Sequence, residues 1–432
     1  MLAASFIRRQ IAHVRRDGRP VLARKVVKAL RIPLEFLLHV LAVPAVIAIR
    51  LIRPWILVRL SALCTDNLGH FTANTELYLC ECDAGINQPG QRHADLLYMP
   101  EPVCNRQLAV MWKRVLRLWP NWILAPIRRV DRLMPGGGSL ERRDNLQGDR
   151  DVHNLLDRFP PHLEFTSEEE SRGQAALRAM GIAPGTPFVC LNVRDGAYNA
   201  YRAIADPASY GDEHSYRDSD VQNYVLAAEA LADRGYVVVR VGAIVREAMK
   251  TIHPGVVDYA TNGKRSDFMD IYLGANCAFC VSTGSGFDGV SSIFRRPIAF
   301  VNFLPLGYLN TYRAQLLGIT RHFFSEADNR ELTLAEIFAR GAGFLDETFH
   351  YQLSGIRLVE NTPEEIRDLV VEMAERLDGT WRPHEEDEAL QRRFWETFSR
   401  SANGLEPEHP WHGEIRARFG AAFLRNNRSW LG

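Results

Sequence analysis

The chain has 432 residues, a length that favours two domains over one. Hydrophobic residues make up 46% and charged residues 24%, which is the composition of a globular protein with a sizeable core. Lysine plus arginine and aspartate plus glutamate number 52 each, so the net charge is zero and creates no general attraction to nucleic acid.

Positive charge is concentrated at the N-terminus. Residues 1–53 contain eleven lysines and arginines but only two acids, Asp17 and Glu35. They also contain an apolar run from Ile32 to Ile49, which Pro33 and Pro44 interrupt. A spanning helix needs about 20 mainly apolar residues. The run therefore predicts a helix that lies in the membrane interface or re-enters it, with a buried core helix as the alternative.

The same segment lacks the pattern of a secretory signal, because its basic lead-in is long and no small-residue cleavage site follows. An anionic membrane surface attracts each Lys or Arg by about 1 kcal/mol. We therefore predict a cytoplasmic protein that is peripherally attached to the inner face of the cell membrane through residues 1–53.

Seven cysteines are present, an odd number. Without a secretory signal we expect them to be reduced thiols. Cys277 and Cys280 form a lone C-x-x-C inside an apolar strand pattern, without a second ligand pair. All seven are predicted to be small hydrophobic core residues, and no metal site is expected.

The first half of the chain opens as an α/β unit. Ile56–Leu60 is predicted as a strand, followed by a glycine-containing turn, a helix over Thr72–Cys80 and a strand over Ala94–Met99. The Trp-rich, basic segment Asn105–Arg132 fits either a membrane-facing or interdomain helix pair or an amphipathic core helix. Residues 136–150 are predicted to be a loop or linker.

The second half alternates continuous apolar strands with helices, the pattern of a parallel sheet covered on both faces. Capping boxes at Thr333 and Thr362 predict the starts of two late helices. The expected strands are Phe188–Val193, Tyr236–Val241, Val256–Tyr259, Cys277–Ser282 and Ile298–Asn302, and the expected helices are Ser167–Met180, Ser219–Arg234, Ala243–Ile252, Asp267–Ala275 and one that ends at Arg295.

In an open parallel sheet, ligands bind outside the carboxyl ends of the strands. Arg194 follows the first of these strands, with Tyr198 nearby, and an arginine at such an edge can donate two parallel hydrogen bonds to phosphate oxygens. The alternative is a surface arginine paired with Asp195. The predicted loop from Arg194 to Asp218 is long for a compact domain, which favours a functional role.

His214 and Arg217 precede the next predicted helix and share the same rim of the sheet, where positive charge would meet a diphosphate. Asp218 and Asp220 imitate a D-x-D metal motif. They stand at a helix start, however, where short oxygen-bearing side chains cap free N–H groups, so we interpret them as capping residues.

A glycine-containing turn links the strand that ends at Ser282 to the next helix. Backbone N–H groups and small side chains could cradle an anion there, although a tight turn is the simpler explanation. The turn is not a P-loop and, despite Gly289, it is not a dinucleotide fingerprint. The predicted phosphate-binding residues of this turn are Ser282, Thr283, Gly284, Ser285 and Gly286.

A catalytic base is sought in the first half of the chain. His70 follows the first strand and could take a proton near neutral pH, although a lone histidine is as often structural. Asp66 and Glu76 are the alternatives.

Several of these motifs together resemble a family of bacterial glycosyltransferases found in surface-carbohydrate gene clusters. The resemblance spans about residues 55–377, and the N-terminal basic and apolar extension departs from it. A more distant likeness is to fucosyltransferases. The segments that carry the resemblance are Leu68–His70, Glu76–Leu77, Val189–Asp195 with Tyr198, His214–Arg217, Asp220–Tyr224, Asp258–Ala260, Ser266–Leu273, Ser282–Gly286, Ile293–Pro297, Val301–Asn302 and Asn361–Ile366.

The resemblance implies a GT-B fold, in which two Rossmann-like domains face a cleft. Residues 54–165 would form the acceptor domain and residues 166–382 the domain that binds a nucleotide sugar. Residues 1–53 would be a membrane-associating extension, and residues 383–432 a helical tail. By analogy with the fucosyltransferases, Arg194 or Arg217 would contact the donor phosphates.

The implied activity is metal-independent transfer of a sugar to a glycan acceptor, lipid-linked if the membrane segment serves it, in cell-surface polysaccharide biosynthesis. No cofactor is expected. Two alternatives remain open: a sugar-nucleotide epimerase of the same fold, and a non-catalytic membrane scaffold of a polysaccharide assembly complex.

Overall fold

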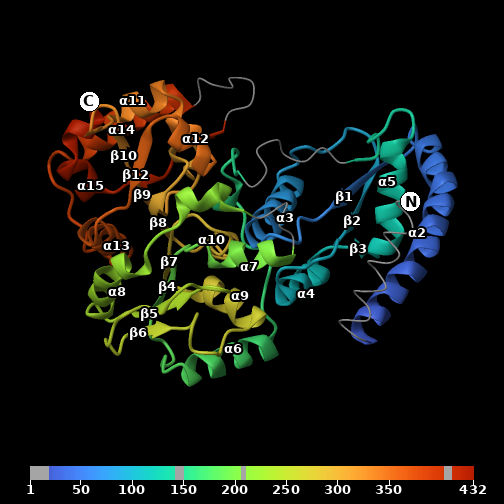
Figure 1. The fold of residues 1–432 in the computed structure, drawn as a ribbon, viewed down its shortest axis with the longest axis horizontal. Coiled ribbons are helices and arrows are strands. Elements are labelled where there is room, and N and C mark those ends of the chain that lie inside the picture. The colour runs from blue at the N-terminus through green and yellow to red at the C-terminus, as the bar shows by residue number, and fades with distance from the viewer. Residues whose placement is uncertain (1–18, 142–149, 206–210, 403–410) are drawn as a thin grey trace, which may run out of the picture. The chain divides into compact units, whose positions relative to one another are not determined.

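The computed structural model describes residues 19–141, 150–205, 211–402 and 411–432 (Figure 1). Parts of four predicted segments lie outside these residues: the basic N-terminal stretch, the linker before Arg150, the middle of the loop after Arg194 and the middle of the C-terminal tail. The chain forms two compact units. Unit 1 contains Met1–Leu63, Pro89–Glu101 and Leu116–Arg143, and unit 2 contains Cys64–Gln88, Pro102–Val115 and Asp144–Gly432.

Unit 1 is built on a three-stranded parallel sheet with the order β1-β2-β3. Its strands are Leu57–Ala62, His93–Tyr98 and Leu118–Trp119. Helix α2 (Arg19–Leu51) packs against α5 (Asn121–Leu133). The predicted apolar helix is therefore present but longer than expected, with Pro33 and Pro44 inside it. By length and composition, Pro33–Leu51 could cross a membrane.

Unit 2 is built on a seven-stranded, wholly parallel sheet with the order β13-β9-β8-β7-β4-β5-β6. From β6 to β9 this is the 3-2-1-4-5-6 strand order of a Rossmann fold. Five predicted strands are confirmed to within two residues. The strands are β4 (Phe188–Asn192), β5 (Val237–Val241), β6 (Val256–Asp258), β7 (Phe279–Ser282), β8 (Ile298–Phe303), β9 (Leu316–Thr320) and β13 (Arg418–Phe419).

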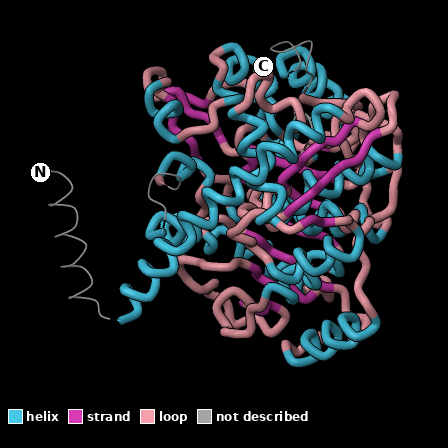
Figure 2. The backbone as a smooth tube through the Cα atoms, turned by 90° about the vertical axis from the view of Figure 1, so that its right-hand side faces the viewer, coloured by secondary structure: helices cyan, strands magenta, loops and turns pink. Residues whose placement is uncertain are grey.

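Helices cover this sheet as the continuous apolar strands predict, and Figure 2 shows them flanking the strands. Helix α8 packs with α13, whereas α10 packs with α3 and α9, and α9 also contacts α4 and α6. Helices α3 and α4, which the sequence placed in the acceptor domain, thus pack in unit 2. Their bounds are α3 (Leu68–Asp83), α4 (Arg106–Val115), α6 (Ser167–Ala179), α7 (Ala197–Ala205), α8 (Val225–Ala232), α9 (Asp267–Asn276), α10 (Asp288–Ile293) and α13 (Pro363–Asp378).

The C-terminal part of the chain also belongs to unit 2. A small antiparallel sheet has the order β11-β10-β12 (Arg330–Glu331, His322–Ser325 and Ile356–Val359). Both predicted capping boxes are confirmed, at α11 (Leu334–Ala339) and α13. The remaining helices are α12 (Thr348–Leu353), α14 (Asp387–Ala402) and α15 (Ala421–Asn426). The predicted tail is therefore integrated into the fold, because β13 pairs with β9.

The helix predicted over Ala243–Ile252 is wrong. Carboxylates from neighbouring elements accept hydrogen bonds from backbone amides of this segment, so those amides are not available to a helix. Asp195 accepts from Arg246 N–H at 2.6 Å, and Asp258 accepts from Met249 N–H at 2.9 Å. The carboxylates of Asp195 and Asp258 therefore hold this segment as an ordered loop beside β5.

Two further expectations need correction. The long loop after Arg194 contains α7 and a 3₁₀ helix over Asp212–Arg217. Four cysteines are buried as predicted, but Cys64 is exposed and two others are only partly buried, so not all seven are core residues.

Candidate functional site

A cavity of about 430 Å³ opens in unit 2 at the carboxyl ends of β4, β5 and β7. Strands β4 and β7 are neighbours in the sheet, with Asn192 opposite Ser282. They are also the pair at which the strand order reverses direction, the position where Rossmann folds bind their ligands. The cavity thus lies where the sequence placed the functional rim.

Arg194 lines this cavity and is held from several sides. Its Nε donates to Oδ1 of Asp218 at 3.1 Å, and its backbone N–H donates to Oγ1 of Thr283 at 3.1 Å. Burial lowers the pKa of its guanidinium, and the nearby charge of Arg217 lowers it further. Arg194 is therefore a partly desolvated cation beside a second one, an arrangement that an anion would stabilise.

Arg217 comes from the 3₁₀ helix and reaches the glycine-containing turn. Its Nη2 donates a hydrogen bond to the carbonyl oxygen of Gly284. Its Nε is buried and has no hydrogen-bond partner among the described residues. Arg217 does not itself line the cavity, and the carboxylate of Asp218 pairs with Arg194. One buried donor of Arg217 is therefore unused. A buried N–H without a partner costs free energy, so it favours an additional acceptor such as a phosphate oxygen.

The turn between β7 and α10 satisfies much of its own hydrogen bonding. The backbone N–H of Ser285 donates to Oδ2 of Asp288 at 2.7 Å, and that of Gly284 donates to Oγ of Ser282 at 3.1 Å. Thr283 supports Arg194 through its hydroxyl. Side chains of the turn and of α10 therefore already accept hydrogen bonds from two of the backbone amides that were predicted to bind an anion. Of this region, Ser285, Gly286 and Phe287 line the cavity.

The glycines of this region have a packing role that the sequence did not reveal. A Cβ on Gly286 would lie 2.9 Å from the backbone nitrogen of Gly69, and a Cβ on Gly289 would lie 2.4 Å from Oγ1 of Thr72. These glycines let α3 cross α10 at close range. In contrast, Gly284 is required by its backbone, with φ of +74°.

Asp195 anchors the loop after β4 and is not the partner of Arg194. Its Oδ1 accepts from the backbone N–H of Ala197 at 3.1 Å. The fully buried Arg240 of β5 lies 3.9 Å from its Oδ2 and 3.0 Å from Asp258. This network fixes the loop at the cavity floor.

Of the other residues that were predicted for this rim, only some line the cavity. Tyr198 lines the cavity and is partly exposed. His214 is exposed and does not line it, and its Nδ1 lies 3.0 Å from the carbonyl oxygen of Asp346. Asp220 caps the start of a 3₁₀ helix by accepting from Gln222 N–H, as predicted, whereas the side chain of Asp218 pairs with Arg194 and does not cap a helix start.

Of the three predicted base candidates, Asp66 lines the cavity. His70 is exposed at the start of α3 and is not part of the cavity wall. Sequence reasoning missed Asp267 and Asp270, which also line the cavity from the first turn of α9. Burial raises the pKa of Asp270 to about 6, although its Oδ2 lies 2.6 Å from Arg265. Asp267 and Asp270 could have been found from the sequence, because both lie in the first turn of a predicted helix, at the edge where the parallel strands end.

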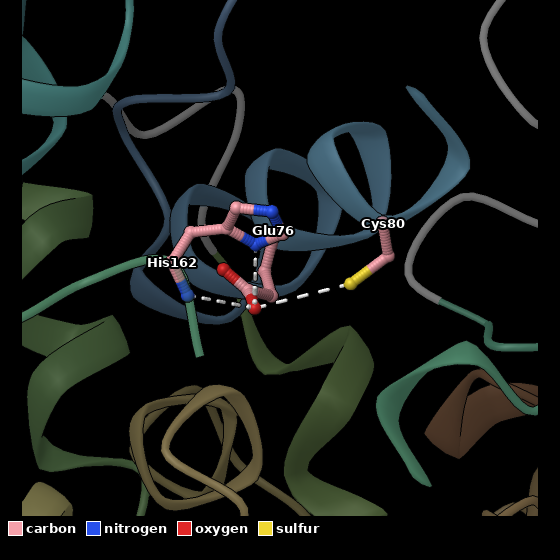
Figure 3. Close-up of side chains that lie close together, drawn as sticks. All are labelled: Glu76, Cys80 and His162. Atoms are coloured by element: carbon pink, nitrogen blue, oxygen red, sulfur yellow. Dashed lines mark hydrogen bonds and ion pairs between the residues drawn. The ribbon is translucent and has the colours of Figure 1, made fainter. Parts of the chain in front are cut away.

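Glu76, the third candidate, is buried elsewhere in unit 2. Figure 3 shows its carboxylate between Cys80 and His162. Its Oε1 lies 3.1 Å from Nδ1 of His162 and 2.6 Å from Nη2 of Arg295. Glu76 is fully buried and does not line the cavity, so its position favours a structural ion pair over proton transfer to an acceptor.

Within the described residues, Glu76, Cys80 and His162 form the group that could offer three ligand atoms to a metal, all within 4.8 Å of one another. The guanidinium of Arg295 already neutralises the carboxylate and lies 3.7 Å from the sulfur of Cys80. A metal ion here would have to compete with a positive charge, so we assign the cluster to an arginine–histidine–glutamate ion network.

Comparison with known proteins gives structural similarity only. No family model and no curated protein matches the chain. A glycosyl transferase family 9 protein from Veillonella parvula is 14% identical, covering 75% of this chain and 97% of that one, with a TM-score of 0.41.

Two E. coli structures match more weakly. ADP-heptose LPS heptosyltransferase II is 15% identical, covering 61% of this chain and 90% of that one, with a TM-score of 0.34. The iron-containing dodecameric glycosyltransferase TibC is 11% identical, covering 58% and 59%, with a TM-score of 0.26. Similarity at this level does not establish a shared function.

Proposed function

We propose that the protein is a glycosyltransferase that uses a nucleotide-sugar donor and needs no metal ion. One observation carries this proposal: Arg194, which lines the cavity, and Arg217 both contact the turn after β7 at the topological switch point, and burial and the charge of Arg217 lower the pKa of Arg194. A nucleoside diphosphate supplies the phosphate oxygens that two guanidinium groups bind best. The cavity of about 430 Å³ is of the size of small-molecule sites.

In the proposed reaction, the bond between the anomeric carbon and the diphosphate oxygen breaks, and a bond forms from an acceptor hydroxyl to that carbon. Negative charge grows on the departing diphosphate. Arg194 and Arg217 stabilise this charge from fixed positions, which lowers the barrier because no solvent must reorganise. The backbone carbonyl of Gly284 and the carboxylate of Asp218 hold the two guanidinium groups in place.

Asp66 is the proposed base, because it lines the cavity and is exposed to an incoming acceptor. It would take the proton of the acceptor hydroxyl as the new glycosidic bond forms. His70 and Glu76 are less suited by position. Asp270 also faces the cavity, but Arg265 holds it and the fold buries it.

The acceptor is proposed to be a lipid-linked glycan at the cytoplasmic membrane face, in cell-surface polysaccharide biosynthesis. The support is the basic N-terminal sequence together with α2, because only 11% of the 18-residue apolar window within Pro33–Leu51 is buried. A membrane-bound acceptor and a membrane-attached enzyme meet in two dimensions, which raises their effective concentration.

The test is a screen of nucleotide sugars for protection against thermal unfolding, with and without EDTA. We expect at least one donor to raise the unfolding temperature and EDTA to leave that shift unchanged. Protection that requires Mn²⁺ or Mg²⁺ would refute the metal-independent mechanism. No protection by any nucleotide sugar would favour the scaffold alternative.

An epimerase is separated from a transferase by incubating the full chain with a nucleotide sugar, with and without a lipid-linked glycan. An epimerase would convert the nucleotide sugar without the glycan, whereas the proposed transferase would release nucleoside diphosphate rapidly only when the glycan is present.

A further inference from the structure

Exposed hydrophobic side chains are concentrated in unit 1. Of the 22 large hydrophobic side chains that are exposed in the described residues, 13 belong to this unit, which is the smaller of the two. On α2 they include Phe36, which is 71% exposed, and on α5 they include Trp122 and Leu133, which are 63% and 79% exposed. Patches of this kind mark a binding surface.

Helix α2 is nevertheless attached to the rest of unit 1. Its Ala42 and Val46 are buried against Leu124 and Val130 of α5. At the end of α2, Nη2 of Arg50 lies 2.6 Å from Oδ1 of the fully buried Asp131. One face of α2 therefore packs against the rest of unit 1, and its other hydrophobic side chains are exposed.

This attachment makes a simple membrane crossing by α2 costly. Helix α5 would enter the bilayer with α2, and α5 carries Arg128, Arg129 and Arg132. Each charge at the centre of a bilayer costs about 3 kcal/mol on insertion scales. The helix pair is better suited to lie in the interface, with its apolar face in the hydrocarbon and its charges at the headgroups.

A groove of about 540 Å³ runs along this helix pair. Its walls are mainly apolar, and Glu35 and His39 also line it. The apolar wall residues are Phe36, Val40 and Val43 of α2, Val130 and Leu133 of α5, and Met134, which directly follows α5.

Arg129 is the cation of this groove. The neighbouring arginines of α5 are paired, since Arg128 and Arg132 both contact Glu141. Arg129 is exposed and has no ion-pair or hydrogen-bond partner among the described residues. An apolar groove with this guanidinium in its wall complements a hydrocarbon chain that ends in a phosphate.

We propose that this groove binds one hydrocarbon chain of an anionic membrane phospholipid, with Arg129 on its phosphate, and so holds unit 1 in the membrane interface. The inference rests on the membrane contact in the proposed function but not on glycosyl transfer. It makes α2 and α5 together a monotopic lipid-binding element, whereas the sequence assigned membrane contact to residues 1–53 and left Asn105–Arg132 between a membrane-facing, an interdomain and a core role.

The test measures binding of the full chain to phosphatidylcholine vesicles with and without phosphatidylglycerol. Arg129→Gln should weaken binding to the anionic vesicles about fivefold, the effect of about 1 kcal/mol for one interfacial cation. Binding to pure phosphatidylcholine should change little. The matched control is Arg92→Gln, which removes an exposed charge of unit 1 outside the groove and should have no such effect.

A second variant tests the groove itself. Val43→Trp adds apolar surface but fills the groove, so it should weaken vesicle binding if a chain must enter. Stronger binding by Val43→Trp, or equal losses in Arg92→Gln and Arg129→Gln, would overturn the proposal in favour of a flat apolar or diffuse electrostatic contact. Nucleotide-sugar protection, measured on the same variants, should persist. Its absence in the wild type would refute the proposed function and leave the lipid result standing.

Discussion

Nη2 of Arg295 lies 2.6 Å from Oε1 of Glu76, a carboxylate with no exposed surface. The two residues are 219 positions apart in the chain, so the ion pair links α3 to the end of α10 inside unit 2. Arg295 adopts a positive φ of 61°, which is uncommon for a residue with a side chain. The pair explains why a glutamate lies buried in the motif that the sequence connected with catalysis.

Removing the arginine should destabilise the protein strongly. Arg295→Met leaves the Glu76 carboxylate buried with a weaker set of partners, and we expect a loss of about 3 kcal/mol in the free energy of unfolding. The double variant Arg295→Met with Glu76→Met should recover part of this loss, because no charge is then left buried. Denaturant unfolding of the three proteins checks this. A loss below about 1 kcal/mol in the single variant would contradict the assignment.

The same cluster predicts a stability change at alkaline pH. Contacts with the Cys80 sulfur and the Glu76 carboxylate raise the pKa of His162 from 6.5 to about 10. Because the folded pKa is raised, the stabilisation is complete below about pH 6.5 and is lost as the pH rises toward about 10. Urea unfolding across this range should show falling stability for the wild type and a flatter profile for His162→Gln. Identical profiles would disprove the role of His162.

The crossing of α3 over α10 can be tested with a double-mutant cycle. Gly289→Ala places a Cβ 2.4 Å from Oγ1 of Thr72, so it should cost about 1–3 kcal/mol of stability. Thr72→Ala removes that oxygen, and the double variant should lose less than the sum of the single variants. Additive losses, measured by thermal or urea unfolding, would show that the two positions do not conflict.

The proposed base predicts a separation of binding from chemistry. Asp66→Asn should lower kcat by about 10²–10⁴-fold while leaving donor protection intact. His70→Gln is the informative counterpart, because the sequence favoured that residue as the base, with Asp66 as an alternative. A large loss of kcat in His70→Gln with normal turnover in Asp66→Asn would transfer the role to the histidine.

Local sequence patterns predicted the sheet of unit 2 well. Strands buried on both faces, such as Phe188–Asn192 and Ile298–Phe303, are continuous apolar runs that no other element imitates. Arg194 and Ser285 follow from that sheet, because the carboxyl ends of β4 and β7 must share an edge. The sequence could therefore predict part of the cavity wall, but not Asp267 and Asp270, which also line it.

The remaining features depend on contacts between distant segments. The failed helix over Ala243–Ile252 is prevented by carboxylates from Asp195 and Asp258, which no local pattern reveals. The role of Glu76 is set by Arg295, and Asp288 accepts a hydrogen bond from a backbone amide of the turn between β7 and α10. Strand β13 is only two residues long and pairs with a strand about a hundred residues earlier, so periodicity could not detect it.

The central claim is that Arg194 and Arg217 bind the diphosphate of a donor, and isothermal titration with a panel of nucleoside diphosphates in EDTA tests it most directly. The account predicts binding by the wild type and a loss of about 10–100-fold in affinity for Arg194→Ala and for Arg217→Ala, as expected for hydrogen bonds to a charged group. Arg178→Ala, an exposed arginine of unit 2 outside the cavity, should bind normally. Equal affinity in all four proteins, or binding that appears only when a divalent metal is added, would contradict it.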